Sequence, residues 1–191
     1  RDTGRCFLDA NYNGIYDEGE EPMPGVKITA IKPAMDEEVA KTFSAEDGTF
    51  TLTGLRGNTY KMRAVLPEDG SDFTRTVSDP LGNHFQSRPG RRENFWNNFV
   101  LNEGQSREMN VGVIYPGSIT GYVYQDNDFS ANRSDKEKIV SGFLVKLMDA
   151  DGNLAAMDKT SVKGKYELTG LSPGTYTMEV TALKDYAFTK I

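Results

Sequence analysis

The chain has 191 residues, of which 28 are acidic and 22 basic, and its formal net charge of −6 argues against a nucleic-acid partner. A single cysteine, Cys6, excludes an internal disulfide framework. No run approaches the ~18 apolar residues of a membrane span, so we expect no direct membrane insertion.

Glycine and proline interrupt the sequence at short intervals, with 19 and 8 copies, respectively. Turn dipeptides such as Asn13-Gly14, Asp47-Gly48 and Asp151-Gly152 recur between short apolar runs, as in a protein with many hairpins. No convincing helical run is present. The nearest candidate, residues 34–41, fits either one helical turn or a loop. We therefore predict an all-β chain.

An acidic stretch of twelve residues, from Asp9 to Glu20, follows the first expected strand at residues 4–8. It matches the calcium-loop pattern D-x-[DN]-x-[DN]-G-x5-E without a mismatch. Such a loop coils around a hard cation and turns alternate oxygen atoms towards it, while Gly14 permits the sharp turn. The predicted ligands are five side chains and the backbone carbonyl of position 7, namely Asp9, Asn11, Asn13, Asp17, Glu20 and Ile15.

The charge of this loop favours a bound cation over a solvated acidic turn, which is the alternative. Residues 9–21 contain five acids and no lysine or arginine. Two carboxylates about 4 Å apart repel by roughly 4 kcal/mol at an effective dielectric of 20. Residues 26–31 alternate as a strand does, so the loop joins two strands and a calmodulin-like sensor is not expected.

The sequence repeats itself after about 116 residues. Residues 48–55, GTFTLTGL, match residues 164–171, GKYELTGL, and Thr59-Tyr60 recurs as Thr175-Tyr176. We therefore predict two tandem domains, residues 1–115 and 116–191. The second copy ends before any counterpart of the first copy's last strands, so it is either a shorter version or lacks its C-terminal strands.

Each copy shows the alternation of strands that are buried on one face, and about seven such strands form a two-sheet sandwich. Phe50, Leu52 and Tyr60 alternate with polar neighbours, as do their counterparts in the second copy. The expected strands cover residues 4–8, 25–31, 39–44, 49–55 and 59–65 of the first copy, followed by residues 77–89, 95–101 and 109–114. In the second copy they cover residues 118–125, 154–160, 165–171 and 175–181, with one further strand starting at residue 142.

The acidic loop of the second copy is degenerate. Its predicted weaker site consists of Asp126, Asp128, Ser130, Asn132 and Glu137. Ala131 replaces the turn glycine, and Ser134 replaces the carboxylate of position 9. Arg133, Lys136 and Lys138 nearly balance the acids, so this loop needs a cation less than the first loop does.

Residues 4–20 (GRCFLDANYNGIYDEGE), the following Pro24-Gly25-Val26 and residues 47–55 (DGTFTLTGL) resemble the calcium-binding B-type repeats of serine-aspartate-repeat surface adhesins of Gram-positive bacteria. These repeats belong to a wider collagen-adhesin B-like group. The resemblance covers residues 1–115 and most of residues 116–191. It implies two tandem Ig-like or prealbumin-like β-sandwiches, with Ca²⁺ at the positions given above.

The resemblance also implies a function. We expect a non-enzymatic stalk or spacer segment, stiffened by calcium, within a longer extracellular protein attached to the cell wall. Neighbouring B-type repeats of the same chain are the expected partners, a host extracellular protein or glycan is a further candidate, and the chain is expected to be a monomer. The alternative is an accessory β-sandwich module of a secreted multidomain enzyme, which binds substrate or acts as a spacer.

Two other features are candidates for binding or catalytic sites. Residues 88–99 contain a locally basic stretch and the only tryptophan, Trp96, which fits either a binding surface or an edge that packs on the sandwich. His84 is the only histidine. No nucleophile–base pair has independent support, so no catalytic residue is predicted.

Overall fold

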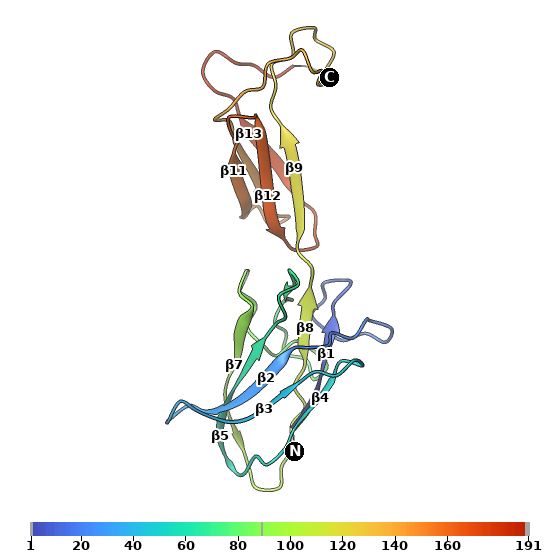
Figure 1. The fold of residues 1–191 in the computed structure, drawn as a ribbon, viewed down its shortest axis with the longest axis vertical. Coiled ribbons are helices and arrows are strands. Elements are labelled where there is room, and N and C mark those ends of the chain that lie inside the picture. Colours follow the sequence, from blue (N-terminus) through green and yellow to red (C-terminus); the bar gives the residue numbers. More distant parts are fainter. Residues whose placement is uncertain (1, 89, 190–191) are drawn as a thin grey trace. The chain divides into compact units, whose positions relative to one another are not determined.

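The computed structural model describes residues 2–88 and 90–189, and contacts divide the chain into two compact units, residues 1–115 and 116–191. The described residues of both units form strands and connecting turns without a helix (Figure 1). Accordingly, that part of the chain offers no helix with the length and apolar character to cross a membrane. The prediction of an all-β chain with two sandwich-like domains is confirmed.

Two four-stranded sheets form the first unit, in the orders β4-β1-β8-β6 and β3-β2-β5-β7. The strands are β1 (Asp2–Leu8), β2 (Lys27–Lys32), β3 (Glu37–Phe43), β4 (Thr49–Leu52), β5 (Asn58–Val65), β6 (Asp72–Phe73), β7 (Glu93–Leu101) and β8 (Val111–Ile114).

β1 leads into the acidic loop and has two partners. Its residues 2–5 pair antiparallel with β4, whereas residues 6–8 pair in parallel with β8. β8 in turn pairs antiparallel with β6. The first and last strands of the unit therefore lie side by side (Figure 1), and the acidic loop starts where their pairing ends.

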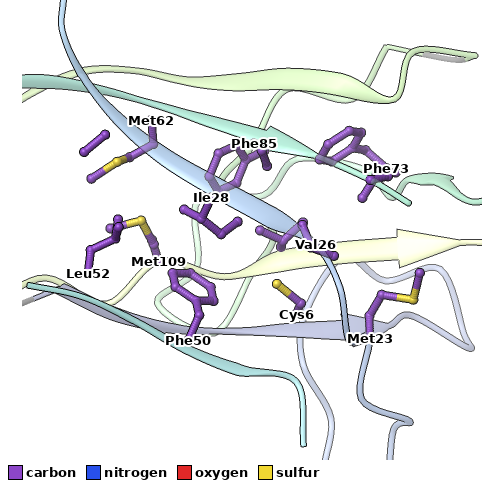
Figure 2. Close-up of a cluster of buried hydrophobic side chains, with 14 of the residues drawn as sticks. Cys6, Met23, Val26, Ile28, Phe50, Leu52, Met62, Phe73, Phe85 and Met109 are labelled. Atoms are coloured by element: carbon purple, nitrogen blue, oxygen red, sulfur yellow. The ribbon is translucent and has the colours of Figure 1, made fainter. Parts of the chain in front are cut away.

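Alternating burial builds the core between the two sheets. Along β5, Tyr60, Met62 and Ala64 are buried, while the residues between them are partly exposed. Figure 2 shows Met62, Ile28 of β2 and Phe50 of β4 among the side chains of one cluster, to which both sheets contribute. Burying each large apolar side chain contributes about 1.5–3 kcal/mol. This core fixes the strands that carry the loop.

The second unit has a smaller sandwich. It contains β9 (Gly117–Tyr122), β10 (Leu144–Met148), β11 (Leu154–Lys159), β12 (Lys165–Leu171) and β13 (Thr177–Thr181), arranged as β12-β9 and β11-β10-β13. Its buried apolar cluster consists of Val145, Leu147, Leu168 and Leu171.

Three predicted elements differ from the structure. Residues 34–41 are neither a helical turn nor a loop throughout, because the chain turns at residues 33–36 and β3 starts at Glu37. Of the strand predicted at residues 77–89, only Gly82 and Asn83 form isolated bridges among residues 77–88, and residue 89 lies outside the described residues. β9 ends at Tyr122 instead of continuing to residue 125, and Tyr124 forms an isolated bridge with Ile139.

Candidate metal centre

The first acidic loop is closed at its base by the strand that carries it. Phe7 forms an isolated antiparallel bridge with Pro22. On either side of this bridge, the Leu8 amide donates to the Glu21 carbonyl at 2.8 Å and the Met23 amide donates to the Cys6 carbonyl at 2.9 Å. The loop therefore begins and ends at adjacent points, which brings positions 1 and 12 together.

The carboxylates of positions 1 and 12 organise the backbone of this loop. Asp9 is buried and accepts hydrogen bonds from the amides of Asn13, at 3.1 Å, and Gly14, at 2.7 Å. Glu20 accepts from the amides of Ala10, at 3.0 Å, and Asp17, at 3.1 Å. Two acidic side chains thus hold four amides, and this fixes the curvature of the loop.

The side chains of positions 3, 5 and 9 converge on one point. The side-chain amides of Asn11 and Asn13 donate to the same oxygen, Oδ2 of Asp17, at 2.8 and 2.7 Å. Two N–H donors aimed at one carboxylate oxygen supply the partial positive charge that a cation would supply. The donor set of carboxylate, amide and carbonyl oxygens is the set that calcium prefers, so the residues fit a calcium ion.

Gly14, at position 6, is required by the backbone. Its φ of +79° lies in the left-handed region that disfavours other residues. A Cβ atom there would lie 2.8 Å from both the carbonyl oxygen and Cγ of Arg75. The predicted role of Gly14 as a turn residue therefore has two physical reasons, conformation and space.

The pKa of Glu20 is raised above its ordinary value of 4.5. Burial is the main cause, and the carboxylates of Asp9 and Asp17 add to it, although backbone amides that donate to Glu20 act in the opposite direction. The charged form of this side chain is thus disfavoured by its surroundings. A cation in the loop would remove that penalty.

Two residues that stabilise this loop were not identified from the sequence. The Thr74 hydroxyl donates to Oδ2 of Asp9 at 2.5 Å, and the backbone amide of Asn83 donates to the Gly14 carbonyl at 2.8 Å. Asn83 is fully buried, and its side chain also bonds the backbone of Thr74 and Gly112. Thr74 and Asn83 lie more than 60 residues from Asp9 in the sequence, so no local spacing pattern identifies them.

The second loop repeats the frame of the first. Seven hydrogen bonds recur at matching loop positions. The backbone amides of positions 5 and 6 donate to the side chain of position 1, and those of positions 2 and 9 donate to the side chain of position 12. The amide of position 5 also donates to the side chain of position 3, the amide of position 7 to the side chain of position 5, and the amide of position 12 to the carbonyl of position 9. Tyr124 bridges Ile139 as Phe7 bridges Pro22. The predicted second site thus has the same backbone arrangement.

The acids of the second loop lie closer together than its degenerate sequence suggested. Ligand atoms of Asp126, Asp128 and Glu137 all lie within 4.8 Å of one another. Ser130 and Asn132 are exposed and bond each other's backbone. The acids among the predicted ligands occupy positions 1, 3 and 12 here, whereas those of the first loop occupy positions 1, 9 and 12.

The turn of the second loop is strained where a glycine is missing. Ala131 adopts a φ of +58°, in the left-handed region where the first loop has Gly14, whereas position 4 has a positive φ in both loops, +58° at Tyr12 and +57° at Phe129. Burial tends to raise the pKa of Asp126, but hydrogen bonds from the Ala131 amide and the Thr189 side chain outweigh it and lower the pKa. Thr189 therefore stands by Asp126 as Thr74 stands by Asp9.

The remaining candidate residues, Trp96 and His84, and the single cysteine, Cys6, pack within the first unit. Trp96 lies on β7 and packs against the core cluster. Its ring stacks on Phe99, at 4.6 Å between centroids, and lies tilted against the ring of His84, at 5.0 Å. His84 accepts a hydrogen bond from the Asn110 amide, and burial lowers the pKa of its ring. Burial also raises the pKa of the Cys6 thiol to about 12. Packing accounts for all three side chains.

Tandem sandwiches whose first strand opens into an acidic twelve-residue loop define a class of repeated β-modules with a candidate cation site. The chain belongs to the SdrD B-like domain family, which matches residues 4–111 and 117–191. The resemblance to B-type repeats of Gram-positive adhesins is thereby confirmed, as is the prediction that the chain is not an enzyme.

Named relatives agree with this family. Serine-aspartate repeat-containing protein F of Staphylococcus epidermidis is 28% identical over 183 residues, which cover 95% of this chain and 10% of that protein. Serine-aspartate repeat-containing protein D of Staphylococcus aureus (strain Newman) is 29% identical over 189 residues, which cover 96% of this chain and 14% of that protein. The chain therefore spans only a small part of the length of these relatives.

Solved structures add a distant similarity. A streptococcal ancillary pilin is 14% identical, with a TM-score of 0.39, and the match covers 98% of this chain and 55% of that one. The shaft pilin SpaA of Lactobacillus rhamnosus GG is 11% identical, with a TM-score of 0.38, and the match covers 96% and 87%. Similarities at this level carry no argument about function.

Proposed function

We propose that this chain is a calcium-binding stalk or spacer segment of a bacterial cell-surface adhesin. Membership of the SdrD B-like family supports the adhesin-repeat part of the proposal. The observation that carries the metal-binding part is the hydrogen-bonded frame shared by the two acidic loops, in which the carboxylates of positions 1 and 12 accept hydrogen bonds from the same backbone amides.

The first loop is the stronger proposed site. Its ligands are Asp9, Asn11, Asn13, Asp17, Glu20 and the carbonyl of Ile15. The second site uses Asp126, Asp128, Ser130, Asn132 and Glu137 and binds more weakly, because position 9 lacks a carboxylate and the turn is strained. Calcium supplies positive charge, which relieves repulsion among the acids and replaces the two asparagine N–H groups at Asp17.

The mechanical role follows from where the first loop is attached. The Asp9 amide donates to the Val113 carbonyl at 2.8 Å, so position 1 of the loop is bonded directly to β8. β8 ends at Ile114, two residues before the second unit begins at Pro116. A cation that fixes the loop would therefore stiffen the segment by which the chain leaves the first unit. At 100 times its dissociation constant, calcium would add about 2.7 kcal/mol to the stability of that unit.

The wider biological setting is part of the same proposal. The relatives are proteins named for serine-aspartate repeats in staphylococci, which supports an extracellular position on the cell wall of a Gram-positive bacterium and neighbouring B-type repeats as partners. These relatives favour the stalk over the accessory module of a secreted enzyme. Contact with a host protein or glycan at Trp96 is a separate hypothesis, which Trp96→Ala tests in a host-surface binding assay.

Thermal unfolding with calcium and with a chelator tests the metal proposal, and the fluorescence of Trp96 reports on the first unit alone. We expect calcium to raise the midpoint of the wild type. Glu20→Gln removes a charged ligand and should abolish most of the rise. Glu21→Gln is the matched control, because Glu21 is exposed and lies just outside the loop. An equal midpoint with and without calcium would refute the proposal.

The stiffening is measured separately from the binding. Spin labels on exposed residues of β3 and β11 report the distribution of distances between the two units. Calcium should narrow that distribution in the wild type and leave it unchanged in Glu20→Gln. If calcium raises the midpoint of thermal unfolding but leaves the width of the distance distribution unchanged, the calcium site stands and its role in stiffening the chain is refuted.

A further inference from the structure

One sheet of the first unit, β3-β2-β5-β7, has an outer face that takes no part in the core (Figure 1). Along β2, both neighbours of Thr29 belong to the core cluster, so Thr29 points to the other side of the sheet. Lys41 of β3 and Arg63 of β5 lie directly opposite Thr29, and Phe95 of β7 lies opposite Arg63. Residues that lie opposite one another share a face, so these four side chains form one row on the outer face.

Four cations lie on this face. Lys27 precedes Thr29 by two residues on β2, and Lys61 precedes Arg63 by two residues on β5, so both lysines point outwards with Lys41 and Arg63. We call the surface formed by Lys27, Lys41, Lys61 and Arg63 the basic face. Because the whole chain has a net charge of −6, the basic face concentrates positive charge on an otherwise acidic protein.

Two carboxylates on the same side of the sheet neutralise the basic face only in part. Arg63 forms an ion pair with Glu38, and Glu93 lies at the start of β7. Among the ion pairs within residues 2–88 and 90–189, none includes a lysine of the basic face. The Lys61 ammonium lies instead over the ring of Phe95, at 3.8 Å from its centroid. The three lysines are therefore available to an anionic ligand.

The centre of the basic face holds hydrogen-bond donors that lack acceptors. Thr29 is fully buried, and its hydroxyl has no hydrogen-bond partner among the described residues. Nε of Arg63, on the strand opposite, is likewise buried and without a partner in that part of the chain. Buried polar groups are nearly always hydrogen-bonded. Two unpaired donors in one row favour an oxyanion, which would supply acceptors when the guanidinium turns towards it.

Apolar side chains flank the cations in the neighbouring row. Phe43 of β3 and Val65 of β5 both lie opposite Lys27, and Phe43 is 58% exposed. The face thus suits a ligand that presents charged groups and apolar C–H surfaces side by side. Sugar rings that carry sulfate groups have this character, whereas a polyphosphate chain presents charge alone.

We propose that the basic face of the first unit binds a sulfated polysaccharide. Sulfate groups pair with Lys27, Lys41 and Arg63, and the rings between them pack along the adjacent apolar row. This surface is distinct from the hypothesis at Trp96, because Trp96 lies opposite the buried Met62 and therefore points to the other side of β7.

The second unit provides a comparison within the same chain, because the corresponding row of its sheet has a different charge. There a single cation lies opposite a carboxylate, and the third member is apolar. The row consists of Met157, Lys146 and Glu179, which lie opposite one another on β11, β10 and β13. Binding should therefore be confined to the first unit.

The experiment titrates the whole chain, labelled with ¹⁵N, with a sulfated heparin oligosaccharide and with the same oligosaccharide after desulfation. A chelator is present throughout, so a failure here leaves the calcium proposal untouched. We expect amide shifts in β2, β3 and β5 with the sulfated form alone. Raising the ionic strength from about 0.1 M to about 1 M should abolish them, because the screening length falls from about 10 Å to about 3 Å. No shifts, equal binding of the desulfated form, or shifts located in β10 and β11 would overturn the proposal.

Paired variants test whether the position of the charges matters. Lys27→Gln combined with Lys41→Gln should weaken binding of the sulfated oligosaccharide about tenfold, since two surface ion pairs are lost. Lys146→Gln combined with Lys159→Gln changes the net charge equally on the second unit, and should leave the affinity unchanged. Equal losses in the two double variants would contradict a site on the basic face. Polyphosphate should bind more weakly than the sulfated oligosaccharide, and equal or tighter binding would refute the assignment to a sugar polymer.

Discussion

The two acidic loops share one backbone frame but differ in the side chains that fill it. In the first, Asn11 and Asn13 both bond Asp17, and Thr74 and Asn83 hold the loop from a distant segment. In the second, three acids approach one another at positions 1, 3 and 12, and the turn lacks its glycine. The comparison indicates that positions 1 and 12 set the shape of the loop, whereas positions 3, 5 and 9 set its demand for a cation.

The largest expected effect comes from removing position 1. Asp9 is 2% exposed and accepts hydrogen bonds from two amides and from Thr74. Asp9→Ala would leave these buried donors unpaired, and should lower the free energy of unfolding of the first unit by about 3 kcal/mol in chelator. Urea denaturation followed by Trp96 fluorescence measures it.

The matched change in the second loop is Asp126→Ala. Because this loop is exposed, water replaces the lost acceptor and the loss of stability should be smaller. Circular dichroism through the second transition measures it. Equal losses in the two units would show that the buried attachment of the first loop has no energetic consequence.

Exchanging the residues of position 6 tests the turn. Gly14→Ala introduces a Cβ at positive φ against the backbone of Arg75, and should destabilise the first unit by about 2 kcal/mol. Ala131→Gly relieves a strained conformation, and should stabilise the second unit by up to about 1 kcal/mol. Denaturation midpoints measure both. Two changes of the same sign would mean that the loops do not share one conformation.

Position 9 tests the demand for a cation. Ser134→Asp restores the missing carboxylate of the second loop, and should tighten its calcium affinity by about tenfold, because the charge of the ligands tunes affinity. Asp17→Ser should weaken the calcium affinity of the first loop by a similar factor. Isothermal titration measures both, with Ser134→Asn as a control that changes the same position and adds no charge. An unchanged affinity in Ser134→Asp would place position 9 outside the metal site.

The smallest expected effect is on the pH dependence of binding. The pKa of Glu20 is raised, chiefly by burial, so protons compete with calcium at a higher pH than for an ordinary glutamate. Lowering the pH from 7 to 5 should therefore weaken calcium binding by the first loop. In the metal-free chain the sign is opposite, since a raised pKa contributes stability at low pH that is lost as the pH rises. Titrations at both pH values measure the change, and a stronger affinity at pH 5 would contradict it.

Features written in local spacing could be predicted from the sequence. The strand at residues 59–65 and the loop from Asp9 to Glu20 rest on patterns within a short window, and the repeat is the recurrence of such patterns about 116 residues later. The parallel pairing of β1 with β8 joins residues more than 100 positions apart, and such a pairing leaves no local signature. The contact of Thr74 with Asp9 also joins distant residues, so no local pattern predicts it, although Thr74 recurs in the second copy as Thr189.

The loops show a second limit of sequence reasoning. Counting acids ranked the first loop above the second, but the distance between carboxylates also depends on which positions they occupy. Asp128, at position 3, joins Asp126 and Glu137, whereas Asp17 lies across the loop and is held by two asparagines. The loop pattern treats the side-chain amides of Asn11 and Asn13 only as oxygen ligands. In the structure their N–H groups donate to Asp17.

The parallel contact between the first and last strands of the first unit determines how that unit carries tension. A pull on the chain acts at Asp2 on β1 and at Ile114 on β8, and the two strands run in the same direction. The load then slides one strand along the other, so the bonds between them must yield together instead of opening one by one. A domain whose first and last strands pair in parallel therefore resists extension through its topology, even without a bound ion.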